Sequence, residues 1–352
     1  MISLDNITQI EFGITSYCNA GCPLCARHNY GTSKLSDNIE LKNLSYEKFV
    51  SISEQLLNHT THISADFCGT VGDIIAHPDA ERIIIFAAKK YKEVNIHTNG
   101  SAKNYEFWHN IGKHKNINVT FSIDGLDDTN HLYRINTDYD KIISNAKVFI
   151  KAGGFATWKF IKFKHNEHQV KEAEILANSL GFKKFESIAS TRWVLPDVKV
   201  LPTAYKNKIN KSKNIVNLAP ATTADKTKIN QYQKQTYALQ EINCRTVADG
   251  YLYIDEVGKL WPCCYFHSHY VAKRSNFLEW WKNIEKLYGK NFNDLQTNNF
   301  KNLLEHDFFV NYLPKSFTSK ENVCYRCLQS CSKGVEQQRI NDFFHKKLVY
   351  ND

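Results

Sequence analysis

The stretch Cys18-Asn19-Ala20-Gly21-Cys22-Pro23-Leu24-Cys25 directly follows a segment whose apolar residues alternate like those of a β-strand. Its three cysteines are separated by three and then two residues. Three thiolates on one short loop can each bind one iron of a cubic 4Fe-4S cluster, whereas full protein ligation needs a fourth cysteine. No fourth cysteine lies nearby, so one iron is left open for chemistry. The alternative is a zinc site, although a tetrahedral zinc usually takes two close cysteine pairs.

The spacing Cys18-x3-Cys22-x2-Cys25 resembles the signature of the radical S-adenosylmethionine (radical SAM) superfamily. The resemblance implies that the open iron binds the methionine moiety of S-adenosylmethionine (SAM). An electron from the cluster, supplied by a donor such as flavodoxin or ferredoxin, then cleaves the sulfonium to a 5'-deoxyadenosyl radical that abstracts a substrate hydrogen. The family usually has an aromatic residue just before the last cysteine. This chain has Leu24 there, so we expect a weaker contact with the cofactor.

Strand-like and helix-like segments alternate over roughly the first 190 residues. Six strands are predicted from alternating or continuous apolar residues, around 10–14, 63–67, 94–98, 119–123, 158–163 and 185–189. Helical spacing follows a candidate N-cap at Ser45, and Asn166 with Gln169 resembles a capping pair. Such βα units predict parallel strands whose working loops lie at the carboxyl ends. The order agrees with the incomplete (β/α)6 barrel that the resemblance also implies.

The composition is that of a folded protein with more than one unit. Its 352 residues suggest about two domains, and its longest apolar run, 83–88, is too short to cross a bilayer. Because the cysteines stand at metal-ligand spacings without a signal peptide, we expect a reducing cytoplasm and no membrane partner. The net charge of +9 invites a nucleic-acid interpretation, but the lysine-rich stretch 199–235 has few aromatic residues for stacking on bases. It is interpreted as a solvated linker, or as a surface for an anionic partner.

Six of the ten cysteines lie in the last third of the chain. Cys244-x13-Gly258-x4-Cys263 followed by Cys324-x2-Cys327 resembles the SPASM and twitch subfamily, and the short twitch form with a single auxiliary 4Fe-4S cluster fits best. A predicted hairpin, with strands around 251–255 and 260–261, would bring the first two cysteines together. The four expected ligands are Cys244, Cys263, Cys324 and Cys327. Cys264 or Cys331 could replace one of them, and a zinc ribbon is the alternative for this half.

These features predict four segments. They are a radical SAM partial barrel over 1–195, a Lys/Asn-rich linker or insert over 196–240, an auxiliary-cluster domain with a β-hairpin over 241–335, and a C-terminal helix or tail over 336–352.

Residues at the ends of three predicted strands resemble family elements that line the cofactor. Gly72-Asp73 partly matches a Gly-Gly-Glu element that contacts the methionine ammonium, because glycine permits close approach and a carboxylate pairs with an ammonium. The alternative is a turn with an aspartate cap. The remaining candidates, expected near the ribose or methionine, are Thr98, Asn99, Ser122 and Asp124. The run 127–134 also looks typical of the family, without an assigned role.

Three functions compete. The first is a radical SAM enzyme that oxidises or otherwise modifies a small polar metabolite. The second keeps the radical chemistry but acts on a peptide. The third is a zinc-dependent nucleic-acid-binding protein. The substrate itself cannot be derived from the sequence, because the fold hosts many reactions.

Overall fold

The computed structural model describes residues 6–60, 62–190, 193, 198–200, 216–234, 241–319 and 321–332. Eight strands form one sheet in the order β10-β9-β1-β2-β3-β4-β5-β6. These strands are β1 (Gln9–Gly13), β2 (Ser64–Cys68), β3 (Glu93–Thr98), β4 (Ile117–Ser122), β5 (Phe155–Lys162), β6 (Lys184–Ala189), β9 (Tyr251–Asp255) and β10 (Leu260–Trp261). The helices of the barrel are α1 (Tyr46–Leu57), α2 (Ala80–Lys90), α3 (Tyr105–Gly112), α4 (Asn130–Tyr133), α5 (Tyr139–Lys151) and α6 (Val170–Ser179).

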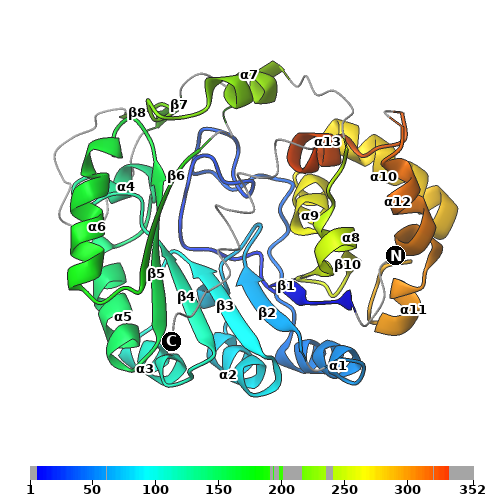
Figure 1. Ribbon diagram of the computed structural model, residues 1–352, viewed down its shortest axis with the longest axis horizontal. Helices are drawn as coiled ribbons and strands as arrows, with labels where there is room; N and C mark the ends of the chain where they lie inside the picture. The colour runs from blue at the N-terminus through cyan, green and yellow to red at the C-terminus, as the bar shows by residue number, and fades with distance from the viewer. Residues whose placement is uncertain are drawn as a thin grey trace.

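Strands β1 to β6 are parallel neighbours in chain order. This confirms the six predicted strands and the open (β/α)6 barrel. The sheet does not close, because β6 and β10 are its two edges. Figure 1 shows the strands as an arc, with helices α1 to α6 outside it and the long loop after β1 in its middle.

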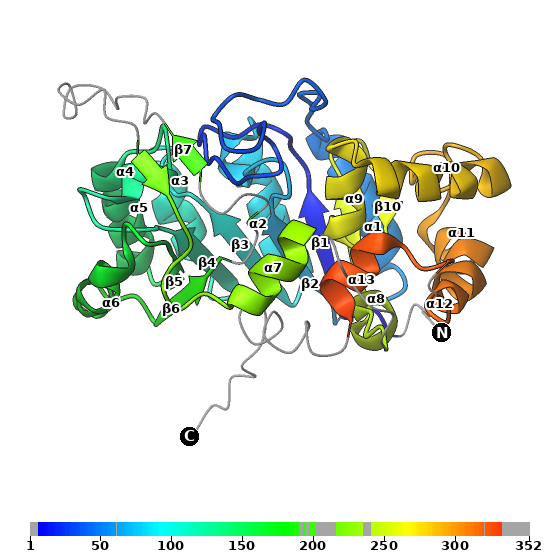
Figure 2. The same cartoon turned by 90° about the horizontal axis from the view of Figure 1, so that it is seen from above.

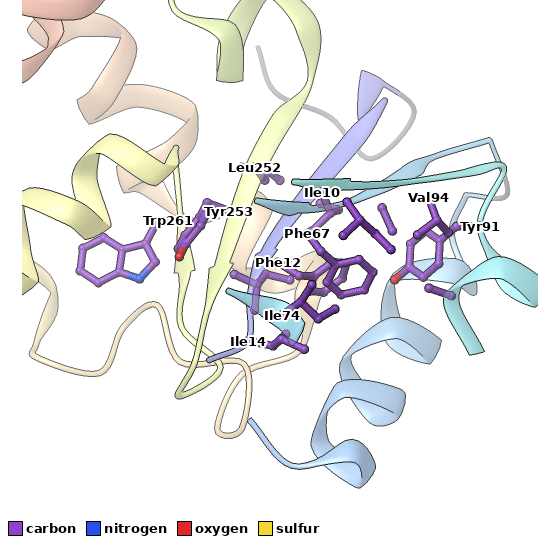
Figure 3. Packing of buried hydrophobic residues seen from close by; sticks show 14 of the residues in the cluster. Ile10, Phe12, Ile14, Phe67, Ile74, Tyr91, Val94, Leu252, Tyr253 and Trp261 are labelled. Atoms are coloured by element: carbon purple, nitrogen blue, oxygen red, sulfur yellow. The ribbon is translucent and has the colours of Figure 1, made fainter. Parts of the chain in front are cut away.

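The outer face of the sheet is apolar and packs on the helices. Phe12 of β1 lies between Phe49 of α1 and Phe67 of β2, with ring centroids 5.1 and 5.8 Å away, as Figure 3 shows for Phe12 and Phe67. The predicted N-cap of α1 is confirmed, because the Ser45 side chain accepts a hydrogen bond from the Lys48 N–H. This packing fixes the position of the β1 end, where the cysteine loop begins.

The inner face carries polar side chains. Asp66 of β2 accepts a hydrogen bond of 2.8 Å from Asn95 of β3 and another from Gln9 of β1. Glu11, the next inward position of β1, is 1% exposed. The barrel therefore holds buried polar groups where a hydrophobic core might have been expected.

The predicted hairpin is confirmed and extends the same sheet. β10 pairs antiparallel with β9, and β9 pairs in parallel with β1 from Gln9↔Tyr251 to Gly13↔Asp255. A Cβ at Gly13 would lie 1.7 Å from the Tyr253 hydroxyl, so only glycine allows this ring to cross β1. The remaining C-terminal elements are α8 (Arg245–Asp249), α9 (Cys264–Val271), α10 (Ser275–Tyr288), α11 (Phe300–Leu304), a π-helix at Phe308–Tyr312, α12 (Leu313–Ser316) and α13 (Tyr325–Cys331).

Part of the predicted linker is ordered. β7 (Val198–Val200) pairs antiparallel with β8 (Val216–Leu218), and α7 (Lys226–Lys234) follows; both views show this segment beside the loop after β1 (Figures 1 and 2). Leu218 and Ile229 join a second apolar cluster that contains Ala20 and Cys22 of the cysteine loop. The sequence predicted a linker or insert here, and the described part of this segment packs through a few isolated apolar residues. The rest of 196–240 and the predicted tail 336–352 lie outside the described residues.

Two smaller observations complete the fold. The expected capping pair is wrong: the Asn166 side chain makes no helix-capping hydrogen bond. Instead it donates to the Asp124 carbonyl at 2.8 Å and accepts from the Phe163 N–H at 2.7 Å, tying two strand ends together. Within the described part of the chain, no helix is both long enough and apolar enough to cross a membrane.

Candidate iron–sulfur and substrate site

The loop between β1 and α1 is held by its own backbone and by the next βα loop. The Leu44 N–H donates to the Ile14 carbonyl at 2.9 Å, which closes the base of the loop. The buried Arg27 guanidinium donates to the Ser16 carbonyl and, at 3.1 Å, to the Val71 carbonyl. These bonds fix the cysteines relative to the strand ends before any cluster is bound.

The three predicted cysteines lie on this loop with hydrogen-bond donors near two of the sulfurs. Cys18 Sγ accepts from the Ala20 N–H at 3.4 Å and from Asn99 Nδ2 at 3.7 Å. Cys22 Sγ lies 3.6 Å from the guanidinium of Arg134. Burial raises the pKa of Cys18, and it raises the pKa of Cys22 to about 11 although Arg134 opposes the shift. Donors aimed at sulfur suit thiolates that bind metal, because binding requires the deprotonated form.

Asp73 is held by the protein itself. One carboxylate oxygen caps the short helix Ile74–Ala76 through the Ile75 N–H at 3.2 Å. The other accepts from the Thr98 hydroxyl at 3.1 Å and from both nitrogens of Asn99 at 2.8 Å. The alternative interpretation, an aspartate cap, is thus confirmed, and four donors already satisfy the carboxylate that was expected to meet the methionine ammonium.

The same network places three other candidates next to Cys18. Thr98 and Asn99 are bound to Asp73, and Asn99 also donates to the Asn19 side chain at 2.9 Å. A Cβ at Gly72 would lie 1.9 Å from the Thr15 carbonyl oxygen, so this glycine allows two loops to touch. The close approach expected toward a ligand is therefore an approach to the cysteine loop.

Asp124 acts through an arginine that the sequence did not single out. Its carboxylate, fully buried, forms an ion pair of 2.6 Å with Arg134 Nε and accepts from the Ile161 N–H at 2.6 Å. Burial lowers the pKa of Arg134, but the charges of Asp124 and Cys22 raise it by more. The overall shift is upward, so the side chain stays a cation. Arg134 is the last residue of the run 127–134. The only sequence signal for its role was an acidic residue, Asp124, ten positions earlier.

The second set of cysteines converges at the amino ends of three helices. Cys244, Cys263 and Cys324 are the N-cap residues of α8, α9 and α13. Burial and the neighbouring Cys331 and Cys244 raise the pKa of Cys263. The Asn243 N–H donates to the Cys331 carbonyl at 2.9 Å, which joins the start of this segment to the end of α13. Helix amino ends stabilise thiolates, so the backbone suits a cluster of negative ligands.

Five cysteines thus gather where a cluster needs four. Cys327 interacts with Cys324, Cys331 and Cys244. The sixth, Cys264, begins α9 and lines the cavity wall together with Glu11. Burial, with the charges of Glu11 and Cys263, raises its pKa. Among the described residues, no three His, Cys, Asp or Glu side chains surround a point that could hold a single metal ion.

One cavity of about 710 Å³ connects the two sets of cysteines. One end is lined by Cys22, Leu24 and Cys25 of the loop. Its other end is lined by Cys244, Cys263, Cys327 and Cys331. Leu24 thus lies where the cofactor was expected. Gly72, Asp73, Thr98, Asn99, Ser122 and Asp124 are not among the described residues of its wall.

The cavity wall is basic. Arg134, Arg245 and Arg326 line it, and Glu11 is its one carboxylic acid among the described residues. Burial, with a smaller effect of the Asp66 charge, raises the pKa of Glu11 to about 8. Arginines beside both cysteine sets would offset the negative charge of bound clusters and ligands.

An open parallel α/β barrel with a three-cysteine loop after its first strand defines a class of iron–sulfur proteins that keep one iron free. Residues 13–185 match the model of the radical SAM superfamily. This part of the chain is therefore a radical SAM domain, and the members of that superfamily are enzymes.

Solved structures of radical SAM enzymes share the fold. Native anSMEcpe with bound AdoMet is similar with a TM-score of 0.56 and 16% identity, over 96% of each chain. Streptococcus suis SuiB bound to the precursor peptide SuiA has a TM-score of 0.55 and 14% identity, over 86% of this chain and 65% of SuiB. SuiB bound to S-adenosylmethionine has a TM-score of 0.50 and 17% identity, over 74% of this chain and 61% of SuiB. The chain thus spans less than two thirds of SuiB. No curated protein matches the sequence.

Proposed function

We propose that this protein binds SAM at a 4Fe-4S cluster held by Cys18, Cys22 and Cys25, and removes a hydrogen atom from a substrate in the cavity. The observation that carries the proposal is the shared cavity, which runs from the three-cysteine loop to the second cysteine set. When bound, the cluster and SAM supply a 5'-deoxyadenosyl radical. The reaction is an oxidation or another modification of an unreactive carbon.

The residues around the loop have separate tasks in this proposal. Arg134, a partly exposed cation 3.6 Å from Cys22 Sγ, would bind the carboxylate at the methionine end of SAM. Asp124 orients that guanidinium. The Asp73, Thr98 and Asn99 network keeps the Cys18 side of the loop in place.

The second cysteine set would hold an auxiliary 4Fe-4S cluster of the twitch type. The expected ligands are Cys244, Cys263, Cys324 and Cys327. The cavity wall favours Cys331 over Cys324, because Cys331 lines the cavity while Cys324 is fully buried behind it. Such a cluster, ligated at every iron, would carry electrons, and a reduced flavodoxin or ferredoxin in the cytoplasm would supply them.

The substrate class follows from the size and charge of the cavity. The cavity of about 710 Å³ would hold SAM as well as the substrate, so the remaining space suits a small molecule. The arginines of the wall favour a polar substrate with acidic groups. A peptide is the second candidate, because the similar structure of SuiB was solved with a precursor peptide. A short peptide encoded beside this protein, modified by it and not by the cluster-free form, would favour the second candidate.

Metal analysis and product formation test the proposal. Protein reconstituted without oxygen is expected to be brown, to carry about eight irons, and to form 5'-deoxyadenosine from SAM and a reductant. Colourless, zinc-loaded protein without 5'-deoxyadenosine would instead support the zinc-dependent nucleic-acid-binding alternative, which membership of the superfamily disfavours.

A further inference from the structure

The turn between β5 and α6 reaches back to the loop that carries Arg134. Gln169 is the N-cap residue of α6, but its side chain makes no capping hydrogen bond there. This residue is 6% exposed, and its amide faces the loop after β4 instead. The amide oxygen accepts hydrogen bonds from the Leu126 N–H at 3.2 Å and from the Thr129 hydroxyl, and the nitrogen donates to the Asp128 carboxylate at 2.7 Å. One buried side chain therefore joins three positions of this loop to the start of α6.

These three positions lead directly into the short helix that ends at Arg134. Helix α4 is a single turn, the side chain of its N-cap residue Thr129 makes no capping hydrogen bond, and Arg134 is its C-cap. A helix of one turn is not stable by itself, because its nucleation costs more free energy than its few hydrogen bonds return. The contacts from Gln169 therefore fix where α4 begins, and with it the position of the Arg134 backbone.

The aspartate that pairs with Arg134 is held from the same turn. Asn166, three residues before Gln169, donates a hydrogen bond to the Asp124 carbonyl at 2.8 Å. The Asp124 N–H donates to the side chain of Asn130, the first residue of α4, at 2.9 Å. The turn before α6 thus anchors both members of the Asp124–Arg134 ion pair, one through the backbone and the other through Gln169.

We propose that Gln169 is a positioning residue for SAM, which holds Arg134 in the place where its guanidinium binds the methionine carboxylate. This inference rests on the role proposed for Arg134. An ion pair depends on distance and direction, and a displacement of about 1 Å is enough to weaken a charged contact strongly. Gln169 is not among the described residues of the cavity wall, so it acts through the arginine and not on the ligand itself.

The test compares SAM with decarboxylated SAM, which lacks the carboxylate that Arg134 would bind. Equilibrium binding of each ligand to anaerobically reconstituted protein is measured for the wild type and for Gln169→Leu. We expect the Kd for SAM to rise roughly tenfold and the Kd for decarboxylated SAM to stay within about twofold. A residue needed only for folding or for cluster assembly would weaken both ligands alike. Asn178→Leu, at an exposed position of α6, is the matched control.

An exchange of hydrogen-bond partners provides a rescue. Gln169→Glu places a second carboxylate against that of Asp128, so this variant should also bind SAM more weakly. Gln169→Glu combined with Asp128→Asn exchanges the donor and the acceptor of the 2.7 Å bond. The introduced carboxylate still accepts from the Leu126 N–H and the Thr129 hydroxyl. The double variant should therefore regain the wild-type Kd for SAM.

A second pair of substitutions assigns the effect to the arginine. In the Arg134→Met background, Gln169→Leu should cause no further loss of SAM affinity, because the contact that it positions is already absent. The proposal would be overturned by an unchanged Kd for SAM in Gln169→Leu, by an equal rise for both ligands, by a full effect in the Arg134→Met background, or by failure of the exchange to restore binding. If the wild type binds neither ligand, the proposed SAM site itself has failed.

Discussion

At the scale of single residues, the site depends on charges that lie behind the cysteines. Asp124 is fully buried and forms an ion pair with the partly exposed Arg134, which reaches Cys22, and Asp73 gathers four donors beside Cys18. Buried charges are tolerated only when they are paired and hydrogen-bonded. These residues are therefore sensitive points, although they lie outside the cavity or at its edge.

Replacement of Arg134 by Met should weaken SAM binding. A hydrogen bond to a charged group contributes about 2 kcal/mol, which corresponds to a rise in Kd of roughly 30-fold. Equilibrium binding of SAM to reconstituted protein measures the change. Arg82→Met, at an exposed arginine on α2, is the matched control. Equal Kd values for wild type and Arg134→Met would contradict the role given to this guanidinium.

The iron content of variants distinguishes Cys331 from Cys324 as the fourth ligand of the auxiliary cluster. We expect Cys331→Ala to lower the iron of reconstituted protein from about eight to about four per chain, while Cys324→Ala retains most of it. Both variants should still form 5'-deoxyadenosine, because the first cluster is unaffected. The reverse pattern would restore Cys324 as the ligand, and loss of all iron in either variant would refute two separate sites.

At the scale of elements, the sequence predicted the strands well because each has its own local signal. Alternating apolar residues that end in Asn99-Gly100 or Asp124-Gly125 mark a strand without reference to the rest of the chain. Contacts between distant elements had no such signal. The pairing of β9 with β1 joins residues about 240 positions apart, and Leu218 and Ile229 look isolated in a lysine-rich stretch.

The same limit explains the candidate site. The cysteines were found because their spacing is local, whereas Arg134 was not, since its partner Cys22 lies on another loop and its partner Asp124 stands ten residues earlier in the chain. Asp73 was expected to meet a ligand, but its partners Thr98 and Asn99 lie on β3 and the turn after it. A sequence motif identifies the residues of a loop and leaves open which of them face each other.

Contact between two loops predicts a steric effect at Gly72. An alanine Cβ would lie 1.9 Å from the Thr15 carbonyl oxygen, which belongs to backbone and cannot move aside easily. Overpacking of this kind costs about 1–3 kcal/mol or more. Chemical denaturation should therefore show a less stable Gly72→Ala variant. Unchanged stability would mean that the two loops do not touch.

The turn after β9 predicts a pH-dependent contribution to stability. His267 of α9 is buried 3.1 Å from the Glu256 carboxylate and 3.9 Å from Asp255, and its ring stacks on Tyr253. Burial alone lowers the pKa of His267, but Glu256 raises it overall. Burial alone raises the pKa of Glu256, but His267 lowers it overall. The pair is therefore most stabilising between the ordinary values of 4.5 for Glu and 6.5 for His.

Replacement of His267 should show over which pH range the pair with Glu256 stabilises the protein. Breaking a buried ion pair costs about 3–5 kcal/mol, so His267→Phe should lose most stability near about pH 5.5. It should lose less at a pH well above the ordinary histidine value, where the wild-type His267 gives up its proton. Urea unfolding at both pH values measures the difference, with the exposed His59→Phe as control. A loss that is equal at both values would contradict the ion pair.

At the scale of the whole molecule, the C-terminal third completes the barrel. β9 and β10 extend the sheet beyond β1, and α8, α9 and α13 bring the second cysteine set to the cavity that the first set opens into. In the proposed function, one cavity between two iron–sulfur sites would let a substrate lose a hydrogen near the first cysteine set and pass an electron to the second.

The central claim is that Cys18, Cys22 and Cys25 hold a cluster with one iron open to SAM. The most direct measurement is 5'-deoxyadenosine formation by anaerobically reconstituted protein, together with its iron content, for the wild type and for each cysteine changed to Ala. We predict 5'-deoxyadenosine from the wild type and none from the three variants, each of which should keep about four auxiliary irons. SAM cleavage that persists in any of these variants would contradict the account.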